Sequence, residues 1–168
     1  MGVGRQSRGA LVTDDHSEET DRLWMQHALG LAERAAQAGE VPVGAVVVRD
    51  GDCLGEGWNQ PLATSDPSGH AEIIALRKAG KYISNYRILN ATLYVTLEPC
   101  IMCAGALVHA RVARVVFGAS DPKSGALSTV WNVPALPDLN HHYAVQGGLL
   151  AEPSARLLQA FFRARRGG

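Results

Sequence analysis

The chain has 168 residues, of which 46% are hydrophobic and 19% are charged. This composition is typical of one folded domain with a substantial core, and it excludes a disordered or fibrous chain. Sixteen basic and sixteen acidic residues give a formal net charge of +0, so any nucleic-acid site must depend on a local cluster of charge.

The N-terminal part of the chain predicts one helix behind a polar segment. Residues 1–19 are polar and contain glycine, so we expect a flexible leader there, followed by a single domain over residues 20–168. A helix is predicted from Thr20, because apolar residues recur at helical spacing, and Gly39 is expected to end it. The residues on its apolar face are Leu23, Trp24, Ala28, Leu31, Ala32 and Ala35.

The middle of the chain alternates between strands and helices. Runs of β-branched residues predict buried strands, clusters of glycine and proline predict turns, and helical spacing of apolar residues predicts helices. The predicted order is strand 43–48, turn 49–52, strand 53–59, loop 60–69, helix 71–78 closed by Gly80, strand 91–97 and helix 100–109.

The last third of the chain predicts two more strands and a final helix. Residues 114–118 and 143–146 have strand character, and three prolines between residues 121 and 140 predict an extended loop. A helix is predicted over residues 154–166, and its expected inward side chains are Leu157, Leu158, Phe161 and Phe162. The alternation of strands and helices indicates a layered α/β domain.

The cellular compartment can also be predicted. No apolar stretch approaches the roughly 18 residues of a membrane span, and the first residues lack the apolar centre of a signal peptide. Three cysteines are too few and too uneven for a disulfide framework, which favours a reducing compartment. We therefore expect a cytoplasmic protein without a membrane anchor.

Two short motifs carry metal-binding residues. They are His70-Ala-Glu72 and Pro99-Cys100-Ile-Met-Cys103, and each begins a predicted helix. Cys100 and Cys103 are three residues apart, so their sulfurs lie on one helical face and can share a metal ion. A helix N-terminus also lowers a thiol pKa. With the imidazole of His70 as a third ligand, this donor set suits zinc.

Three protein ligands leave the fourth tetrahedral position for water. This is typical of a catalytic zinc, since structural sites are normally closed by four ligands. Bound zinc brings the pKa of water down to about 7. Glu72 is poorly placed as a ligand, but in the first helical turn it can reach the activated water and act as a proton shuttle.

The combined pattern is the signature of zinc-dependent nucleobase deaminases. From about Leu23 to Arg166 the chain resembles the bacterial tRNA-specific adenosine deaminases, a family of the cytidine-deaminase-like superfamily. The resemblance is densest in blocks 40–46, 55–59, 70–73, 85–87, 91–106, 114–118 and 161–163.

This resemblance implies a three-layer α/β/α fold with a central mixed sheet of about five strands. It implies one Zn²⁺ per subunit, held by His70, Cys100 and Cys103. Glu72 would move protons while zinc-activated water converts adenosine to inosine at the wobble position of a tRNA anticodon. The implied partners are a tRNA, expected to be an arginine tRNA, and a second copy of the chain.

The resemblance also implies substrate contacts. Asn59 matches the position that hydrogen-bonds the flipped adenine, and Val43 matches an apolar wall of the base pocket. Asp121 falls in a loop that contacts RNA near the target nucleotide. Residues 127–139 depart from the family pattern, so no contacts are transferred there.

Basic residues at the end of the chain are candidates for RNA backbone contacts. Arg163, Arg165 and Arg166 follow two phenylalanines, a pattern that can hold phosphates or stack bases. Arginine near a helix C-terminus also has a purely structural explanation, because it stabilises the helix dipole.

Other interpretations remain open on the sequence alone. One is a deaminase of a free nucleobase or nucleotide, such as cytosine, guanine or deoxycytidylate. Another is a non-catalytic, zinc-stabilised RNA-binding module, although such a site has no use for the carboxylate of Glu72. A surface of Met102, Ala104, Ala106 and Leu107 would suit either a dimer interface or the core.

Overall fold

The computed structural model describes residues 17–167, so the first 16 residues of the predicted leader lie outside the described residues. Helix α1 (Glu18–Gln37) begins two residues before Thr20, the predicted start of the first helix. The hydroxyl of Ser17 caps the helix by accepting a hydrogen bond from the amide of Thr20 at 3.1 Å. Three acidic residues in the first turn then lie at the positive end of the helix dipole.

The five strands form one mixed sheet. They are β1 (Gly44–Arg49), β2 (Asp52–Trp58), β3 (Thr92–Leu97), β4 (Arg114–Ala119) and β5 (Ala144–Gln146), in the spatial order β2-β1-β3-β4-β5. Strand β1 is antiparallel to β2 and β3, whereas β4 is parallel to β3 and β5. The predicted mixed sheet of five strands is confirmed.

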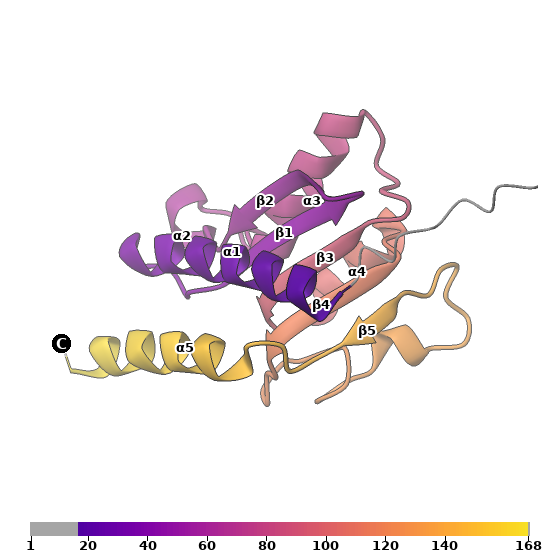
Figure 1. The fold of residues 1–168 in the computed structure, drawn as a ribbon. Coiled ribbons are helices and arrows are strands. Elements are labelled where there is room, and N and C mark those ends of the chain that lie inside the picture. Colours follow the sequence, from indigo (N-terminus) through magenta and orange to yellow (C-terminus); the bar gives the residue numbers. More distant parts are fainter. Residues whose placement is uncertain (1–16, 168) are drawn as a thin grey trace, which may run out of the picture.

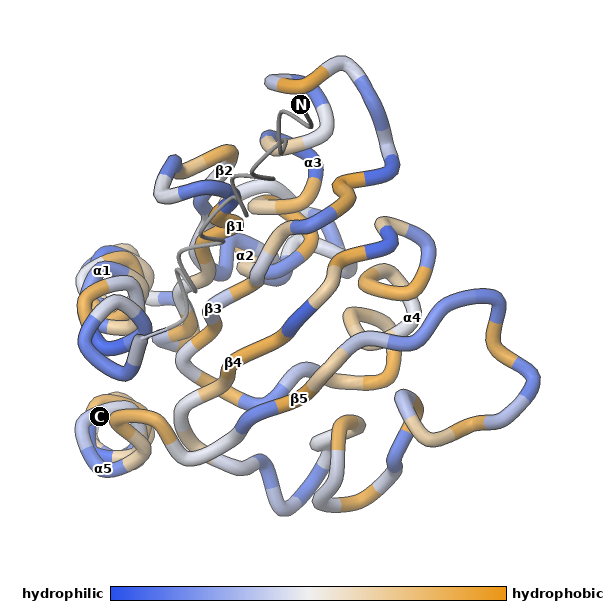
Figure 2. The backbone as a smooth tube through the Cα atoms, turned by 45° about the vertical axis from the view of Figure 1, so that its right-hand side comes forward, coloured by the Kyte–Doolittle hydropathy of each residue, from blue (hydrophilic) through white to orange (hydrophobic). Residues whose placement is uncertain are grey.

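Helices cover both faces of this sheet. Helix α1 and helix α5 (Ala151–Arg166) lie on one face, and α3 (Ala71–Ile83) and α4 (Ile101–Ala110) lie on the other (Figures 1 and 2). The predicted loops contain the short helix α2 (Pro61–Thr64) and a 3₁₀ turn, η1 (Val133–Ala135). The predicted three-layer α/β/α arrangement is therefore confirmed. Among the residues that the structure describes, no helix is long and apolar enough to cross a membrane.

Strand residues alternate between two cores. On one face, Val46, Tyr94 and Val116 pack with Met25 and Ala28 of α1. The other face forms the larger core against α3 and α4, with Val47, Val95, Val115, Ala75 and Leu107 among its members. Because both faces are covered, five of the six residues in each of the central strands β1 and β3 are buried.

A buried ion pair ties α1 to the sheet. The guanidinium of Arg114 donates to both carboxylate oxygens of Asp21, at 2.9 and 2.5 Å. The hydroxyl of Tyr94 donates to the same carboxylate at 2.6 Å. Asp21 is 3% exposed, so these donors replace the water that the carboxylate has lost.

Glycines let α3 approach β2 very closely. A Cβ at Gly57 would lie 2.8 Å from the carbonyl oxygen of Ala71, and one at Gly55 would lie 2.5 Å from the carbonyl oxygen of Ala75. The missing side chains therefore fix the distance between this strand and the helix that begins beside His70.

Some sequence predictions were wrong in detail. Gly80 does not end α3, which continues to Ile83 and is capped by Ser84 at φ 55°. Leu23 is 61% exposed, because it points away from the sheet. Helix α5 begins at Ala151, and Phe162 is 44% exposed rather than inward. Only one side of α5 meets the protein, since it packs mainly against β4 and α1.

Candidate active site

The predicted site residues converge at one edge of the sheet. Strands β2, β3 and β4 run in the same direction, so the segments that follow them all begin at this edge. These segments carry Asn59, the helix starts at His70 and Cys100, and Asp121. Functional residues commonly gather beyond the carboxyl ends of strands in such α/β sheets.

His70 and Cys100 are the N-cap residues of α3 and α4, and neither side chain caps its own helix. The Nδ1 atom of His70 lies 3.6 Å from the sulfur of Cys100 and 3.6 Å from that of Cys103. The three ligand atoms lie within 4.8 Å of one another. The structure thus brings together the three residues that the sequence predicted as metal ligands.

These distances fit zinc. Bond lengths of about 2.3 Å to sulfur and 2.0–2.1 Å to nitrogen, at tetrahedral angles, place a sulfur and a nitrogen about 3.6 Å apart. Both nitrogen–sulfur distances of the site match this value. One nitrogen and two sulfurs are also the donor set expected for zinc, and no fourth histidine, cysteine or carboxylate joins the cluster among the described residues.

The two sulfurs differ in their protonation before a metal binds. A hydrogen bond from the Cys103 thiol, supported by His70 and opposed by burial, lowers the pKa of Cys100 to about 4. The same hydrogen bond, together with burial, raises the pKa of Cys103. The hydrogen bond with Cys100 also raises the pKa of His70. Metal binding must therefore displace a proton from Cys103.

Glu72 lies directly beside this cluster. Its side chain is 4% exposed in the first turn of α3, and its carboxylate interacts with the thiol of Cys103. Burial raises the pKa of Glu72 above its usual range. As predicted, Glu72 is not one of the three clustered ligands. A carboxyl group placed beside the ligands is suited to proton transfer.

Asn59 and Val43 lie together beside the start of α3. The backbone amide of Asn59 donates to the carbonyl oxygen of Val43 at 3.1 Å. The side-chain oxygen of Asn59 accepts from the amide of Ala71 at 2.9 Å, which satisfies one free amide at the helix N-terminus. Its side-chain nitrogen remains as a donor for another group. Val43 is 4% exposed and belongs to the core on the α3 side.

Asp121 uses its carboxylate within its own loop. It accepts from the backbone amide of Lys123 at 3.0 Å and from the hydroxyl of Ser124 at 2.9 Å. The carboxylate therefore shapes the turn, and the part of the loop that faces outward is formed by its neighbours.

Two buried carboxylates next to the site were not predicted from the sequence. Glu98 is 2% exposed and accepts hydrogen bonds from the segment that contains Asp121. Glu40 is also 2% exposed and accepts from the amides of Leu62 and Ala63, at 2.9 and 3.1 Å, at the start of α2. A proline follows each glutamate closely, directly after Glu98 and one residue later after Glu40. No rule of sequence spacing marks either glutamate as buried.

The three arginines predicted as candidates for RNA contact make different contacts in the structure. Arg165 donates to the carbonyl oxygen of Gly39 at 2.5 Å and lies 4.7 Å from the ring centroid of Phe161, so it holds α5 against the end of α1. Arg163 is exposed, and its Nε atom donates to the carbonyl oxygen of Gln159 in its own helix at 3.4 Å. Arg166 lines a groove of about 450 Å³ between α5 and the loop after β4.

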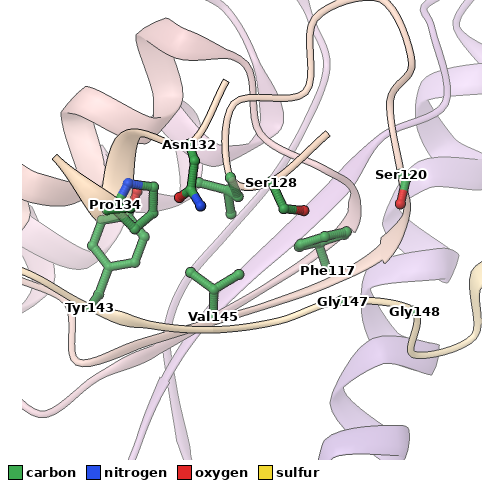
Figure 3. A pocket seen from close by; sticks show the side chains of 11 residues that line it. Phe117, Ser120, Ser128, Asn132, Pro134, Tyr143, Val145, Gly147 and Gly148 are labelled. Carbon is green, nitrogen blue, oxygen red and sulfur yellow. The ribbon is translucent and has the colours of Figure 1, made fainter. Parts of the chain in front are cut away.

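Another pocket lies near the edge strand β5 (Figure 3). It has a volume of about 660 Å³, and Phe117, Ser128, Asn132 and Tyr143 are among the residues that line it. Much of its wall comes from residues 127–139. None of the three clustered ligands lines this pocket, so it is separate from the metal site.

The fold and the three-ligand site together define a zinc-dependent deaminase. A sequence model of the cytidine and deoxycytidylate deaminase zinc-binding region matches residues 18–119. This match covers α1 to β4 and includes all three ligands and Glu72.

Individual relatives indicate which kind of deaminase the chain resembles most. The tRNA-specific adenosine deaminase of Haemophilus influenzae is 52% identical over 149 residues, which cover 88% of this chain and 86% of that protein. The enzyme of the same name from Streptococcus pyogenes serotype M1 is 40% identical over 148 residues, or 88% of this chain and 86% of that protein.

A solved structure supports the same placement. It comes from a study of A-to-I editing by tRNA:A34 deaminases at the wobble position of transfer RNA. It matches with a TM-score of 0.79 and 40% identity, and the match covers 81% of this chain and 99% of that chain. The chain therefore belongs to the cytidine and deoxycytidylate deaminase family, and within it to the tRNA-specific adenosine deaminases.

Proposed function

We propose that this chain hydrolyses adenosine to inosine at the wobble position of a tRNA anticodon. The observation that carries the proposal is the 52% identity to a tRNA-specific adenosine deaminase along 88% of the chain. The geometry supports it, because three ligands suited to zinc lie beside a buried carboxylate. A cytoplasmic location follows, since tRNA is processed there.

Water adds across the C6=N1 bond of adenine, and the bond from C6 to the amino group then breaks, so that ammonia leaves and inosine remains. When zinc is bound, it lowers the pKa of a water molecule and makes hydroxide available near neutral pH. We assign the proton transfers to Glu72, which takes a proton from water, delivers it to ring nitrogen N1 and then helps the amino group leave. Its burial keeps it beside the ligands and away from bulk solvent.

The base must leave its stack to reach a site at two helix N-termini. We assign recognition of the flipped adenine to the side-chain nitrogen of Asn59, because its oxygen is already used by α3. Val43 would form an apolar wall. Anticodon loops already expose their bases, which reduces the free energy needed for flipping.

The groove between α5 and the loop after β4 is our candidate path for the RNA. Lys123, Phe162 and Arg166 line it together, so two cations and an exposed aromatic ring face one channel. Such a combination holds phosphates and stacks bases without needing a basic protein overall. Arg163 would add a contact at the exposed side of α5. Arg165 also remains a candidate for RNA contact, because it lines a hollow with Lys123, Phe162 and Arg166 while it bonds to Gly39.

A homodimer is part of the proposal. Ala104 and Leu107 are completely buried in the core, so they cannot contribute to an interface, but Ile101 and Met102 on the same helix are 56% and 36% exposed. Ala106 lines a groove of about 570 Å³ between α3 and α4. A second copy that packs on this face would bury these apolar side chains. Light scattering of the purified protein measures the oligomeric state.

The decisive experiment offers several substrates to one zinc-loaded preparation. An arginine tRNA transcript with A34 is incubated beside the same transcript with G34, other A34 transcripts, and free cytosine, guanine and deoxycytidylate. Sequencing detects inosine in the RNA, and ammonia release reports on the free compounds.

We expect inosine only at position 34 of the tRNA, with the arginine transcript preferred. Ammonia release from a free base or nucleotide, without inosine in any tRNA, would replace the proposal by the nucleobase-deaminase alternative. Tight RNA binding with no turnover on any substrate would instead favour a non-catalytic binding module.

A further inference from the structure

The buried carboxylate of Glu98 accepts several hydrogen bonds from the loop after β4, and the proposed reaction gives it no role. Its Oε2 atom accepts from the backbone amides of Leu127, Ser128 and Thr129, at 3.1, 3.0 and 3.1 Å. Its Oε1 atom accepts from the amide of Asp121 at 3.2 Å and from the hydroxyl of Thr129. Four backbone amides and a hydroxyl thus converge on one carboxylate.

Glu98 lies close in the chain to a candidate metal ligand. It lies between the end of β3 and the zinc-ligand residue Cys100. Its own amide donates to Ala119 at 2.8 Å, and the amide of Ala126 donates to Pro99 at 2.9 Å. One buried side chain therefore joins the segment that carries a metal ligand to the loop that follows β4.

The loop is shaped to receive this carboxylate. A Cβ at Gly125 would lie 2.5 Å from both the Cδ and the Oε1 atoms of Glu98, so only glycine allows the loop to pass at this distance. Residues 121–124 of the same loop line the groove that also contains Phe162 and Arg166. The position of the groove wall relative to the ligands therefore depends on Glu98.

We propose that Glu98 is a positioning residue, which sets the loop after β4 for RNA binding without touching the reacting atoms. This inference rests on the proposed function, because the substrate that the loop would contact is the tRNA. A disordered loop would have to be ordered each time RNA binds, and that entropy would weaken binding. Holding the loop in advance removes this loss.

Glu98→Gln tests the proposal with little change in shape. An amide has only one oxygen, so it can serve the three amides of residues 127–129 or the amide of Asp121, but not both groups. We expect the oxygen to face the larger group. The amide of Asp121 then loses its acceptor, and the loop loosens at the end that lines the groove.

Two measurements follow the variant. Hydrogen exchange monitored by NMR should show faster exchange of the Asp121 amide, while amides in β3 and α4 keep their protection. Steady-state deamination of an A34 anticodon stem-loop should show KM up to about 10-fold higher with kcat within about 2-fold, since an unsatisfied, partly buried donor corresponds to at most roughly a tenfold change in an equilibrium. Zinc content should stay at that of the wild type.

Two further variants act as a second test and a control. Gly125→Ala disturbs the same contact from the loop side, so it should raise KM similarly, and the double variant should add little to either change. Glu40→Gln removes an equally buried carboxylate that serves α2. It should speed exchange of the Leu62 and Ala63 amides and leave the Asp121 amide unchanged.

The outcomes separate this inference from the proposed function. If Glu98→Gln leaves the exchange of the Asp121 amide unchanged, or lowers kcat with KM unaltered, the positioning role is wrong. If the wild-type protein makes no inosine in tRNA, the proposed function fails instead, and the exchange data then judge the loop contact alone. If Glu98→Gln does not fold, Gly125→Ala decides the question by the same two measurements.

Discussion

Substituting Gly57 by alanine is the sharpest test of how the fold positions the site. The new Cβ would lie 2.8 Å from the carbonyl oxygen of Ala71 and 2.8 Å from two side-chain carbons of Ile74. Ordinary contacts begin at about 3.4 Å, so α3 must withdraw from β2 by roughly 0.6 Å. Overpacking of this kind costs about 1–3 kcal/mol of unfolding free energy.

The same displacement of α3 also moves residues of the candidate active site. Ala71 lies between His70 and Glu72, so the helix start cannot move without moving both residues. A misplacement of 1 Å can cost about 100-fold in rate, and we therefore expect roughly a 10-fold loss of kcat for a shift near 0.6 Å. Weaker zinc binding should accompany it, because the imidazole moves away from the two sulfurs.

Urea unfolding, zinc titration and inosine formation measure these three effects on one preparation. Gly30→Ala is the matched control, because its Cβ in α1 would have no neighbour within 4 Å and alanine favours a helix by about 0.5–1 kcal/mol. If Gly57→Ala keeps its stability within about 0.5 kcal/mol and its rate within about 2-fold, Gly57 does not set the position of α3.

Four further outcomes are expected. Glu72→Ala should keep zinc and fold while turnover falls about 10²–10⁴-fold, and normal turnover would remove the proposed shuttle. Asp21→Asn should lower the free energy of unfolding by about 3–5 kcal/mol in urea titrations, because the cation of Arg114 loses its buried partner; a change below about 1 kcal/mol would contradict this. Burial and the hydrogen bond to Asp21 raise the pKa of Tyr94, so its contribution to stability is complete below the unfolded pKa near 10 and is lost above it. Unfolding free energy should then fall by up to about 1.4 kcal/mol more per pH unit in the wild type than in Tyr94→Phe, as measured by urea unfolding between pH 9 and 11. Removing zinc with a chelator should lower the unfolding temperature in differential scanning fluorimetry, and added zinc should restore it, since metal binding stabilises only the folded chain.

The zinc ligands could be predicted because their signal is local. The spacing of Cys100 and Cys103 places both sulfurs on one helical turn, and His70 with Glu72 completes a pattern that few other sites share. The order of strands and helices could also be predicted, since apolar periodicity depends on neighbours in the chain. These features come from short-range geometry, which the sequence encodes directly.

The ends of helices and the exposure of their faces were harder to predict from the sequence. A glycine ends a helix only when the chain leaves the helical conformation there. The residues after Gly80 stay helical to Ile83, and Ser84 ends the helix in a left-handed conformation. The inward face of α5 was also misjudged, because its apolar periodicity does not show how little of the helix the sheet covers. Exposure depends on what packs against a helix, and that partner lies far away in the chain.

The sequence by itself determined the three candidate metal ligands, the alternation of strands and helices and the family. Only the tertiary structure decided that Glu98 holds the loop after β4, that Arg165 anchors α5 while Arg166 lines the groove, and that the oxygen of Asn59 serves α3. The physical reason is the range of the interactions. Motif and periodicity join residues within a few positions, whereas these contacts join residues 12 to 126 positions apart, and burial assigns each side chain its role only after the strands are paired.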